Sequence, residues 1–163
     1  MTPPREIVLR CLRGYADRGV FRGFGAGEGR RGNLVCRFLW HAPEPHRLRF
    51  EPRRAALVFV DLLPEVPYPS DMDRELRRFL AGRSSDDLPA HRRIDPAKAS
   101  CRCRNRGGRV SIEVRCLDGD VEYAAGKAVK LVNEIFLNFL AGPYDSYMIE
   151  HFGAPEEYLQ PRR

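Results

Sequence analysis

The chain has 163 residues, of which 43% are hydrophobic and 31% are charged, and its formal net charge is +6. This composition excludes both an intrinsically disordered chain and a membrane-embedded protein. Single domains commonly contain about 100–200 residues, so we expect one domain over residues 1–153 and a tail over residues 154–163. The N-terminal segment mixes charged residues with apolar ones and lacks a signal-peptide pattern, so we expect a cytoplasmic protein with no membrane partner.

The first half of the chain predicts one helix followed by strands. Apolar residues recur at helical spacing over residues 4–16. Strand patterns follow at residues 20–24, 34–41, 47–51 and 56–62, and the glycine-rich stretch 23–32 reads as a hairpin loop. The short connections favour an antiparallel meander. Ser70 is expected to cap a helix that ends near Ala81.

The second half predicts a hairpin and two helices. Residues 99–105 and 109–117 flank the turn signal Arg106-Gly107-Gly108. A long helix over residues 120–141 comes next, and a short one ends at Phe152. The order α-β-β-β-β-α-β-β-α-α predicts an α+β fold, in which an antiparallel sheet (meander plus hairpin) packs against the long C-terminal helix.

Apolar residues fill about half of the circumference of the predicted helix 120–141. A helix that rests on one sheet needs an apolar stripe only about 100° wide, so a second contact is expected. The last helix of the same chain is the favoured contact, and a second subunit is the alternative. The candidate interaction residues are Val129, Phe136, Leu137, Leu140, Tyr144 and Tyr147.

Cys101, Cys103 and Cys116 lie on strand-like segments and could be read as metal ligands. The register that aligns the apolar faces of the hairpin pairs Cys103 with Val110 and Cys101 with Ile112. Cys116 then lies about 13 Å from Ile112 along the strand, too far to share a zinc ion. We therefore expect buried thiols and predict neither a metal nor a cofactor.

The arginines of the predicted hairpin gather on the face opposite the cysteines. They are Arg102, Arg104, Arg109 and Arg115, and this face could attract phosphate groups. It carries no aromatic residue on which nucleic-acid bases could stack. Of the 28 basic residues, 25 are arginine, which favours a codon preference over selection for a ligand. A nucleic-acid partner is therefore the less favoured expectation.

Catalytic motifs are missing from the sequence. It contains neither a G-x-S-x-G nucleophile elbow nor an H-E-x-x-H metal motif. The loop over residues 83–97 holds His91, Arg92, Arg93 and Asp95. These are the only neighbouring side chains in the sequence that we consider for a catalytic role. We name no catalytic residue and expect a protein that is not an enzyme.

The element order, together with the run Ala128-Val-Lys-Leu-Val-Asn-Glu-Ile-Phe136 after the hairpin, resembles the type III secretion chaperone-like fold, including the YbjN family. The resemblance extends over residues 5–141. It implies a non-enzymatic protein-interaction module that binds a protein partner or forms a homodimer, without catalytic residues. This is the leading expectation, and anion or nucleic-acid binding through the arginine face is the alternative.

Overall fold

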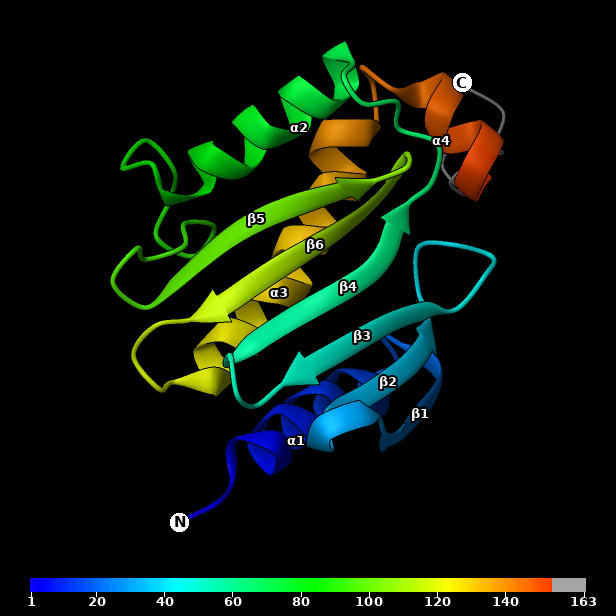
Figure 1. The fold of residues 1–163 in the computed structure, drawn as a ribbon. Helices are drawn as coiled ribbons and strands as arrows, with labels where there is room; N and C mark the ends of the chain where they lie inside the picture. Colours follow the sequence, from blue (N-terminus) through cyan, green and yellow to red (C-terminus); the bar gives the residue numbers. More distant parts are fainter. Residues whose placement is uncertain (154–163) are drawn as a thin grey trace.

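The computed structural model describes residues 1–153 and forms a six-stranded antiparallel sheet with helices on one side (Figure 1). The predicted tail, residues 154–163, lies outside the described residues. The elements are α1 (Pro4–Asp17), β1 (Arg22–Glu28), β2 (Leu34–Leu39), β3 (His46–Glu51), β4 (Ala56–Leu63), α2 (Asp71–Ala81), β5 (Ala99–Arg106), β6 (Arg109–Cys116), α3 (Val121–Glu134), a π-helical segment (Ile135–Leu140) and α4 (Asp145–Phe152). The predicted order and the α+β class are confirmed.

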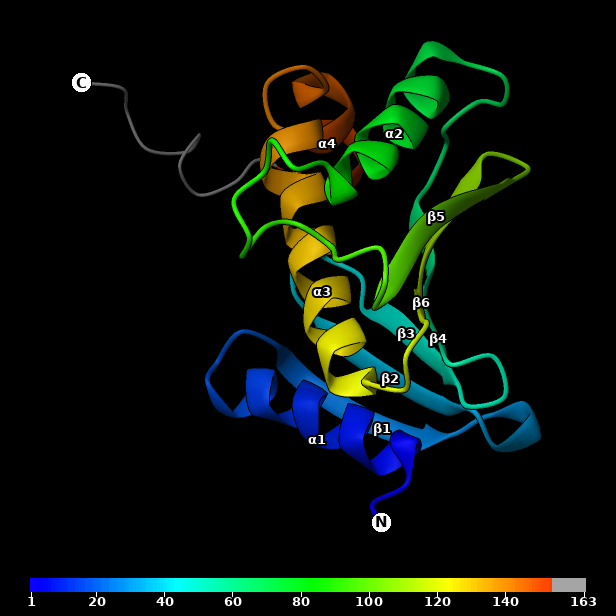
Figure 2. The same cartoon turned by 90° about the vertical axis from the view of Figure 1, so that its left-hand side faces the viewer.

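The strand order in the sheet is β1-β2-β3-β4-β6-β5. The β5–β6 hairpin therefore joins the meander through β6, and β1 and β5 are the two edges. Along β2, β3, β5 and β6 the residues alternate between the buried face and the opposite face, whereas β1 is mostly exposed and β4 mostly buried. Figure 2 shows the sheet from its side, with α1 and α3 packed against the buried face. The largest fully buried side chains include Phe38, Phe50, Phe59, Leu57 and Ile112.

The predicted helix 120–141 is divided into α3 and the π-helical segment, and its broad apolar surface is covered by the chain itself. Helix α1 packs along α3. Phe136 contacts the ring of Phe152 in α4, with centroids 4.9 Å apart, and Phe139 contacts Phe79 in α2 at 5.5 Å. We expected the last helix of the same chain to supply the second contact, and α4 does so. Helices α1 and α2 add further contacts with this apolar surface.

The glycine-rich stretch is a strand and not the expected loop. Residues Arg22–Glu28 form β1, whose Ala26 opposes Cys36 and whose Gly27 opposes Val35 on β2. Alternate glycines do not prevent extended backbone from pairing with a neighbouring strand. The predicted strand 20–24 was therefore too short, and the connection to β2 is confined to residues 29–33.

The hairpin register also differs from the expected one. Cys103 opposes Ile112, Cys101 opposes Val114, and Ala99 opposes Cys116. The turn consists of Gly107 and Gly108 alone, with φ values of 60° and 89°. Two consecutive residues with positive φ form a two-residue turn that matches the twist of antiparallel strands. With this turn the observed strand pairing is shifted by two residues from the expected register.

Candidate anion-binding site

No helix within residues 1–153 lies on the second face of the sheet, which we call the open face (Figures 1 and 2). Residues point to it when their strand neighbours point into the core, as Arg37 does between buried Cys36 and Phe38. The registers place arginines from four strands on this face: Arg37 of β2, Arg47 and Arg49 of β3, Arg102, Arg104 and Arg106 of β5, and Arg109 and Arg115 of β6.

Three adjoining hollows cross the open face, and together we call them the groove. A hollow of about 490 Å³ over β4, β6 and β5 is lined by residues that include Arg104, Arg109 and Val58. It shares Arg49 and Val60 with a neighbouring hollow of about 400 Å³. That hollow shares Val35 and Arg37 with a third, of about 410 Å³, over β1 and β2. The three hollows together therefore extend from one edge strand to the other.

A bulge in β4 shapes the largest hollow. The register between β4 and β6 shifts between Phe59 and Leu63, and Asp61 within the bulge has a φ of 49°. The hydroxyl oxygen of Ser111 on β6 accepts a 3.0 Å hydrogen bond from the Asp61 backbone N–H. β-Bulges bend the strand that carries them, and Figure 1 shows β4 curving strongly along its length.

An ion-pair ladder crosses part of the open face, formed by Arg49, Glu51, Arg54, Glu113 and Arg102. Glu51 lies 3.2 Å from Arg49 and 3.3 Å from Arg54. Glu113 accepts a 2.6 Å hydrogen bond from each of Arg54 and Arg102. Burial disfavours the charged form of Glu113, but these two guanidinium groups outweigh it and hold the pKa of Glu113 below its usual value. The ladder therefore neutralises three arginines only in part and keeps them in place.

The other arginines of the groove form no ion pair within the described part of the chain. Arg37 lies directly opposite Arg47, and Arg106 lies directly opposite Arg109. Like charges directly opposite each other on adjacent strands destabilise a sheet. The groove thus carries uncompensated positive charge at two places, one on β2 and β3 and one on β5 and β6.

The hairpin arginines named from the sequence are brought together only in part. Arg104 and Arg109 line the largest hollow, Arg102 belongs to the ion-pair ladder, and Arg115 lies on the open face beyond the groove. Arg37 and Arg47 were missed. The alternation of residues along β2 and β3 indicated on which face of the sheet Arg37 and Arg47 lie. Nothing in the sequence of β2 and β3 indicated that β4 and β6 would place the hairpin in the same sheet.

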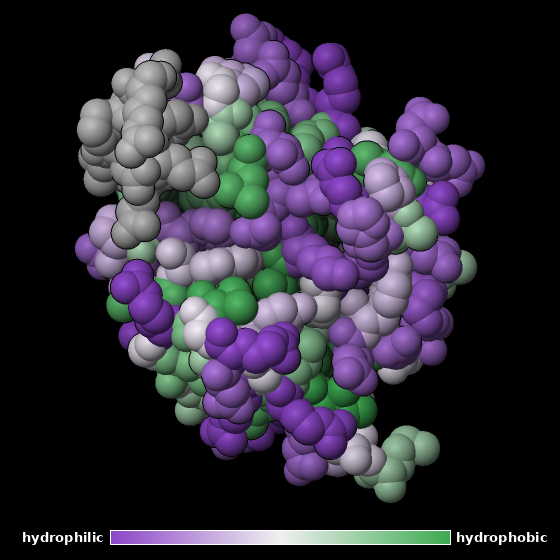
Figure 3. Space-filling view, turned by 180° about the vertical axis from the view of Figure 1, so that it is seen from behind, coloured by the Kyte–Doolittle hydropathy of each residue, from purple (hydrophilic) through white to green (hydrophobic). Residues whose placement is uncertain are grey.

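The residues expected at a protein interface are mostly internal. Val129, Phe136 and Leu140 are buried, whereas Leu137 is 56% exposed. Tyr144 and Tyr147 are half-buried, and their hydroxyls donate hydrogen bonds to the Glu75 carboxylate and the Pro64 carbonyl, respectively. Burial, together with the Glu75 carboxylate, raises the pKa of Tyr144 to about 12. Figure 3 shows the helix-covered side, where hydrophobic surface occurs in separate small areas among hydrophilic residues.

The loop over residues 83–97 is anchored by structural contacts. Arg92 donates a 2.8 Å hydrogen bond to Glu134 of α3, and Arg93 lies 3.1 Å from Asp86. The backbone N–H of Asp95 donates to the hydroxyl of Tyr123 at 2.9 Å, and the His91 carbonyl accepts from Lys127 at 3.1 Å. These contacts hold the loop against α3 and do not gather its side chains into one site.

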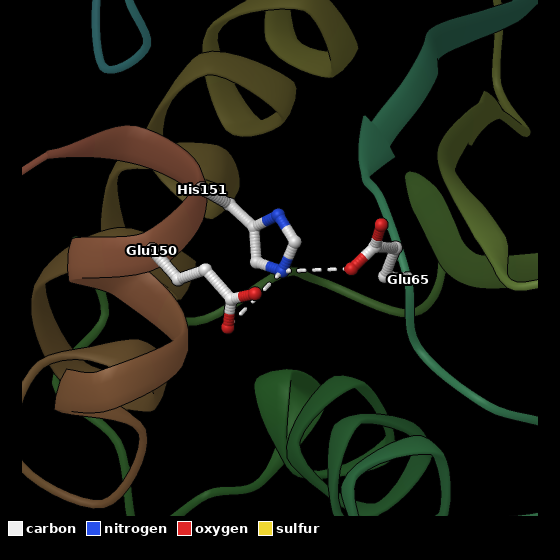
Figure 4. A group of neighbouring side chains, drawn as sticks. All are labelled: Glu65, Glu150 and His151. Carbon is white, nitrogen blue, oxygen red and sulfur yellow. Dashed lines mark ion pairs between the residues drawn. The ribbon is translucent and has the colours of Figure 1, made fainter.

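Glu65, Glu150 and His151 form a small cluster outside the groove (Figure 4). The imidazole Nε2 of His151 lies 3.6 Å from the Glu65 carboxylate and 4.0 Å from that of Glu150. The ring also packs against Tyr147, with centroids 4.4 Å apart. Because the two carboxylate side chains are 74% and 71% exposed, this arrangement fits an ion pair between α4 and the segment after β4.

The five cysteines are free thiols. Cys36 is buried and Cys101 is half-buried, and burial raises the pKa of each to about 11. A thiol with a raised pKa is protonated at neutral pH and is a poor nucleophile. The positions of these cysteines therefore suit packing against the core.

Comparisons with protein-family models, with curated proteins and with solved structures find no match to this chain. No helix within residues 1–153 combines the length and the apolar character needed to cross a lipid bilayer.

Proposed function

We propose that this chain is a non-enzymatic binding protein of the cytoplasm that holds a polyanion in the groove of its open face. The observation that carries the proposal is the hollow of about 490 Å³ on the sheet face that no helix within residues 1–153 covers. Arg104, Arg106 and Arg109 line it, and no ion pair within residues 1–153 engages them. Guanidinium groups form forked hydrogen bonds with phosphate oxygens, so a phosphate-bearing ligand suits this lining.

The ion-pair ladder supports the proposal by organising the groove before a ligand arrives. Glu113 holds the side chains of Arg54 and Arg102 across the strands. Arginine side chains lose conformational entropy when a ligand orders them, and prior ordering reduces that cost. The ligand then meets a surface of fixed shape that still has a net positive charge.

The test is the binding of fluorescently labelled inorganic polyphosphate, followed by anisotropy over a range of salt concentrations. We expect binding that weakens steeply as salt rises, because bound cations are displaced from the polyanion. The variant R104E/R109E should bind at least about 10-fold more weakly at about 0.15 M salt, because two charge-assisted contacts are lost.

The matched control is R10E/R13E. It makes the same change in net charge, at exposed residues of α1 on the helix-covered side. Exposed charges farther apart than about 8 Å are largely screened at this salt concentration, so the control should bind like the unaltered chain. Equal weakening by both variants, or binding that does not respond to salt, would refute the proposal.

A second candidate function is the protein-interaction module expected from the secretion-chaperone-like resemblance, acting through self-association. The observation that favours it is Leu137, which is 56% exposed on the π-helical segment. Light scattering should then show a dimer that L137E converts to a monomer. A monomer at every concentration of the unaltered chain would rule out this second candidate.

A further inference from the structure

We propose that the polyanion is a single-stranded nucleic acid that lies across the strands and contacts two separate arginine clusters. This inference rests on the proposed function of the groove. The first cluster is Arg37 with Arg47, and the second is Arg104, Arg106 and Arg109. The two clusters lie in hollows that share Arg49 and Val60, so one extended ligand can follow the groove between them.

The strand order gives the distance that the ligand must span. Arg47 pairs with Val60 on β4, and β6 separates β4 from Arg104 on β5. Adjacent strands lie about 4.8 Å apart, so β3, which carries Arg47, is about 10 Å from β6, which carries Arg109, and about 14 Å from β5, which carries Arg104. Arg37 on β2 lies one strand farther away. A ligand with repeated negative charges can place separate charges on the two clusters.

The surface between the clusters includes apolar side chains. Val58 and Val60 lie there, and the same hollow is also lined by Asp61, Ser111 and Glu113. A ligand that fits both the clusters and the valines carries separated charges with apolar groups between them. Each nucleotide has one phosphate and one base with an apolar face, whereas inorganic polyphosphate offers charge alone.

The direction of the groove favours nucleic acid over an acidic peptide. Extended peptides usually bind a sheet by adding a strand at its edge, where they find backbone hydrogen-bond partners. A peptide crossing the middle of this sheet would place its backbone N–H and C=O groups over valines, and unpaired polar groups there are costly. The sugar-phosphate backbone of a nucleic acid has no repeating N–H and C=O groups that need hydrogen-bond partners.

The concave form of the groove favours a single strand over a duplex. Proteins usually read double-stranded DNA by inserting a helix or a two-stranded ribbon into its major groove. Here Val58 and Val60 line a hollow together with the surrounding arginines. Within residues 1–153 the groove has no aromatic lining residue, so bases would stack on guanidinium planes, and we expect little preference between base sequences.

The test compares labelled ligands by anisotropy at several salt concentrations: thymidine strands of 2, 4, 8 and 16 nucleotides, a 16-base-pair duplex, polyphosphate and polyglutamate. We expect the 16-nucleotide strand to bind at least 10-fold more tightly than the duplex, polyphosphate and polyglutamate. We also expect the dinucleotide, which has fewer phosphates to place on the two clusters, to bind at least 10-fold more weakly than the 16-nucleotide strand.

Two variants then test the spanning geometry. R37Q/R47Q and R104Q/R109Q should each weaken binding of the 16-nucleotide strand about 10-fold or more. Each should also reduce the slope of log affinity against log salt by about 1.4, the value for two lost contacts with a single strand. R10Q/R13Q on α1 is the matched control and should change neither quantity. All four arginines to be replaced in the groove are exposed, and thermal unfolding should show that every variant folds.

The outcomes separate this inference from the proposed function. Binding of polyphosphate that needs Arg104 and Arg109, without binding of thymidine strands, would overturn only the nucleic-acid inference. Tighter binding of the duplex or of polyglutamate would also overturn it and would point to that class of ligand. A full effect of R104Q/R109Q with no effect of R37Q/R47Q would overturn the spanning geometry. Binding of none of these ligands would refute the proposed function itself.

Discussion

Asn105 on β5 donates a 3.0 Å hydrogen bond to the buried carboxylate of Asp73 on α2. The same amide group donates to the Val66 carbonyl at 2.8 Å, and its oxygen accepts from the Gly108 N–H at 2.9 Å. Burial disfavours the charged form of Asp73, but hydrogen bonds from Arg77 and Asn105 outweigh it and lower its pKa. One side chain thus joins α2, the segment after β4 and the turn of the hairpin that carries Arg106 and Arg109.

Replacing Asn105 with alanine should lower the free energy of unfolding by about 2–4 kcal/mol, because it leaves a buried carboxylate oxygen and two backbone groups without this partner. Urea denaturation would measure the loss. The neighbouring R104A is the control, since Arg104 is exposed and its loss should change stability by less than about 0.5 kcal/mol. Equal stabilities of the two variants would contradict this role of Asn105.

The hydroxyl of Ser70 caps α2, as predicted from the sequence, and accepts a 3.1 Å hydrogen bond from the Asp73 N–H. S70A should therefore cost about 1 kcal/mol of stability, measured by thermal or urea unfolding. S70D keeps an oxygen acceptor at the cap and should retain most of that stability. A loss as large in S70D as in S70A would argue against the capping role.

A histidine pair should make the fold sensitive to acid. His46 is buried and His41 is half-buried, and the His46 Nε2 accepts a 3.2 Å hydrogen bond from the His41 backbone N–H. The His41 ring stacks on Phe136, with centroids 4.5 Å apart, and its Nε2 contacts Asn133 at 3.1 Å. Burial lowers the pKa of each histidine to about 4, and for His41 the neighbouring His46 contributes as well.

Because these pKa values are lower in the folded chain than in the unfolded one, the unfolded state binds more protons between pH 6.5 and pH 4. Stability should be complete above about pH 6.5 and fall as the pH is lowered, by about 3 kcal/mol for each histidine. Urea midpoints at pH 7.5, 5.5 and 4.5 would measure this. H46Q should make the dependence shallower, and H91Q, at an exposed histidine, should leave it unchanged. An unaltered dependence in H46Q would contradict the assignment.

Glu113 limits the charge of the groove, because it holds Arg54 and Arg102. E113Q should release both guanidinium groups and raise polyanion affinity by about 3–10-fold, with a steeper dependence on salt. The control is E122Q, which removes one exposed acid from the first turn of α3 on the helix-covered side. A fall in affinity for E113Q would mean that the order supplied by the ladder matters more than its charge.

The sequence alone determined the class of the fold, the order of its elements and the face on which each strand residue lies. Period-two alternation placed Arg102 and Arg104 opposite the cysteines, and the pattern around Ser70 predicted the start of α2. These properties depend on residues close together along the chain. The glycine-rich β1 and the register of the hairpin were mispredicted, because pairing between strands competes with the local signals of glycine.

Only the tertiary structure decided which strands are neighbours, and that decision creates the groove. β6 lies beside β4, so the arginines of β2 and β3 share one surface with those of the hairpin. The same folding covers the broad apolar surface of α3 with α1 and that of the π-helical segment with α2 and α4, leaving Leu137 exposed. Alternation along a strand determines the face of a side chain, but strand neighbours depend on hydrogen bonds and packing between distant segments, which no local pattern encodes.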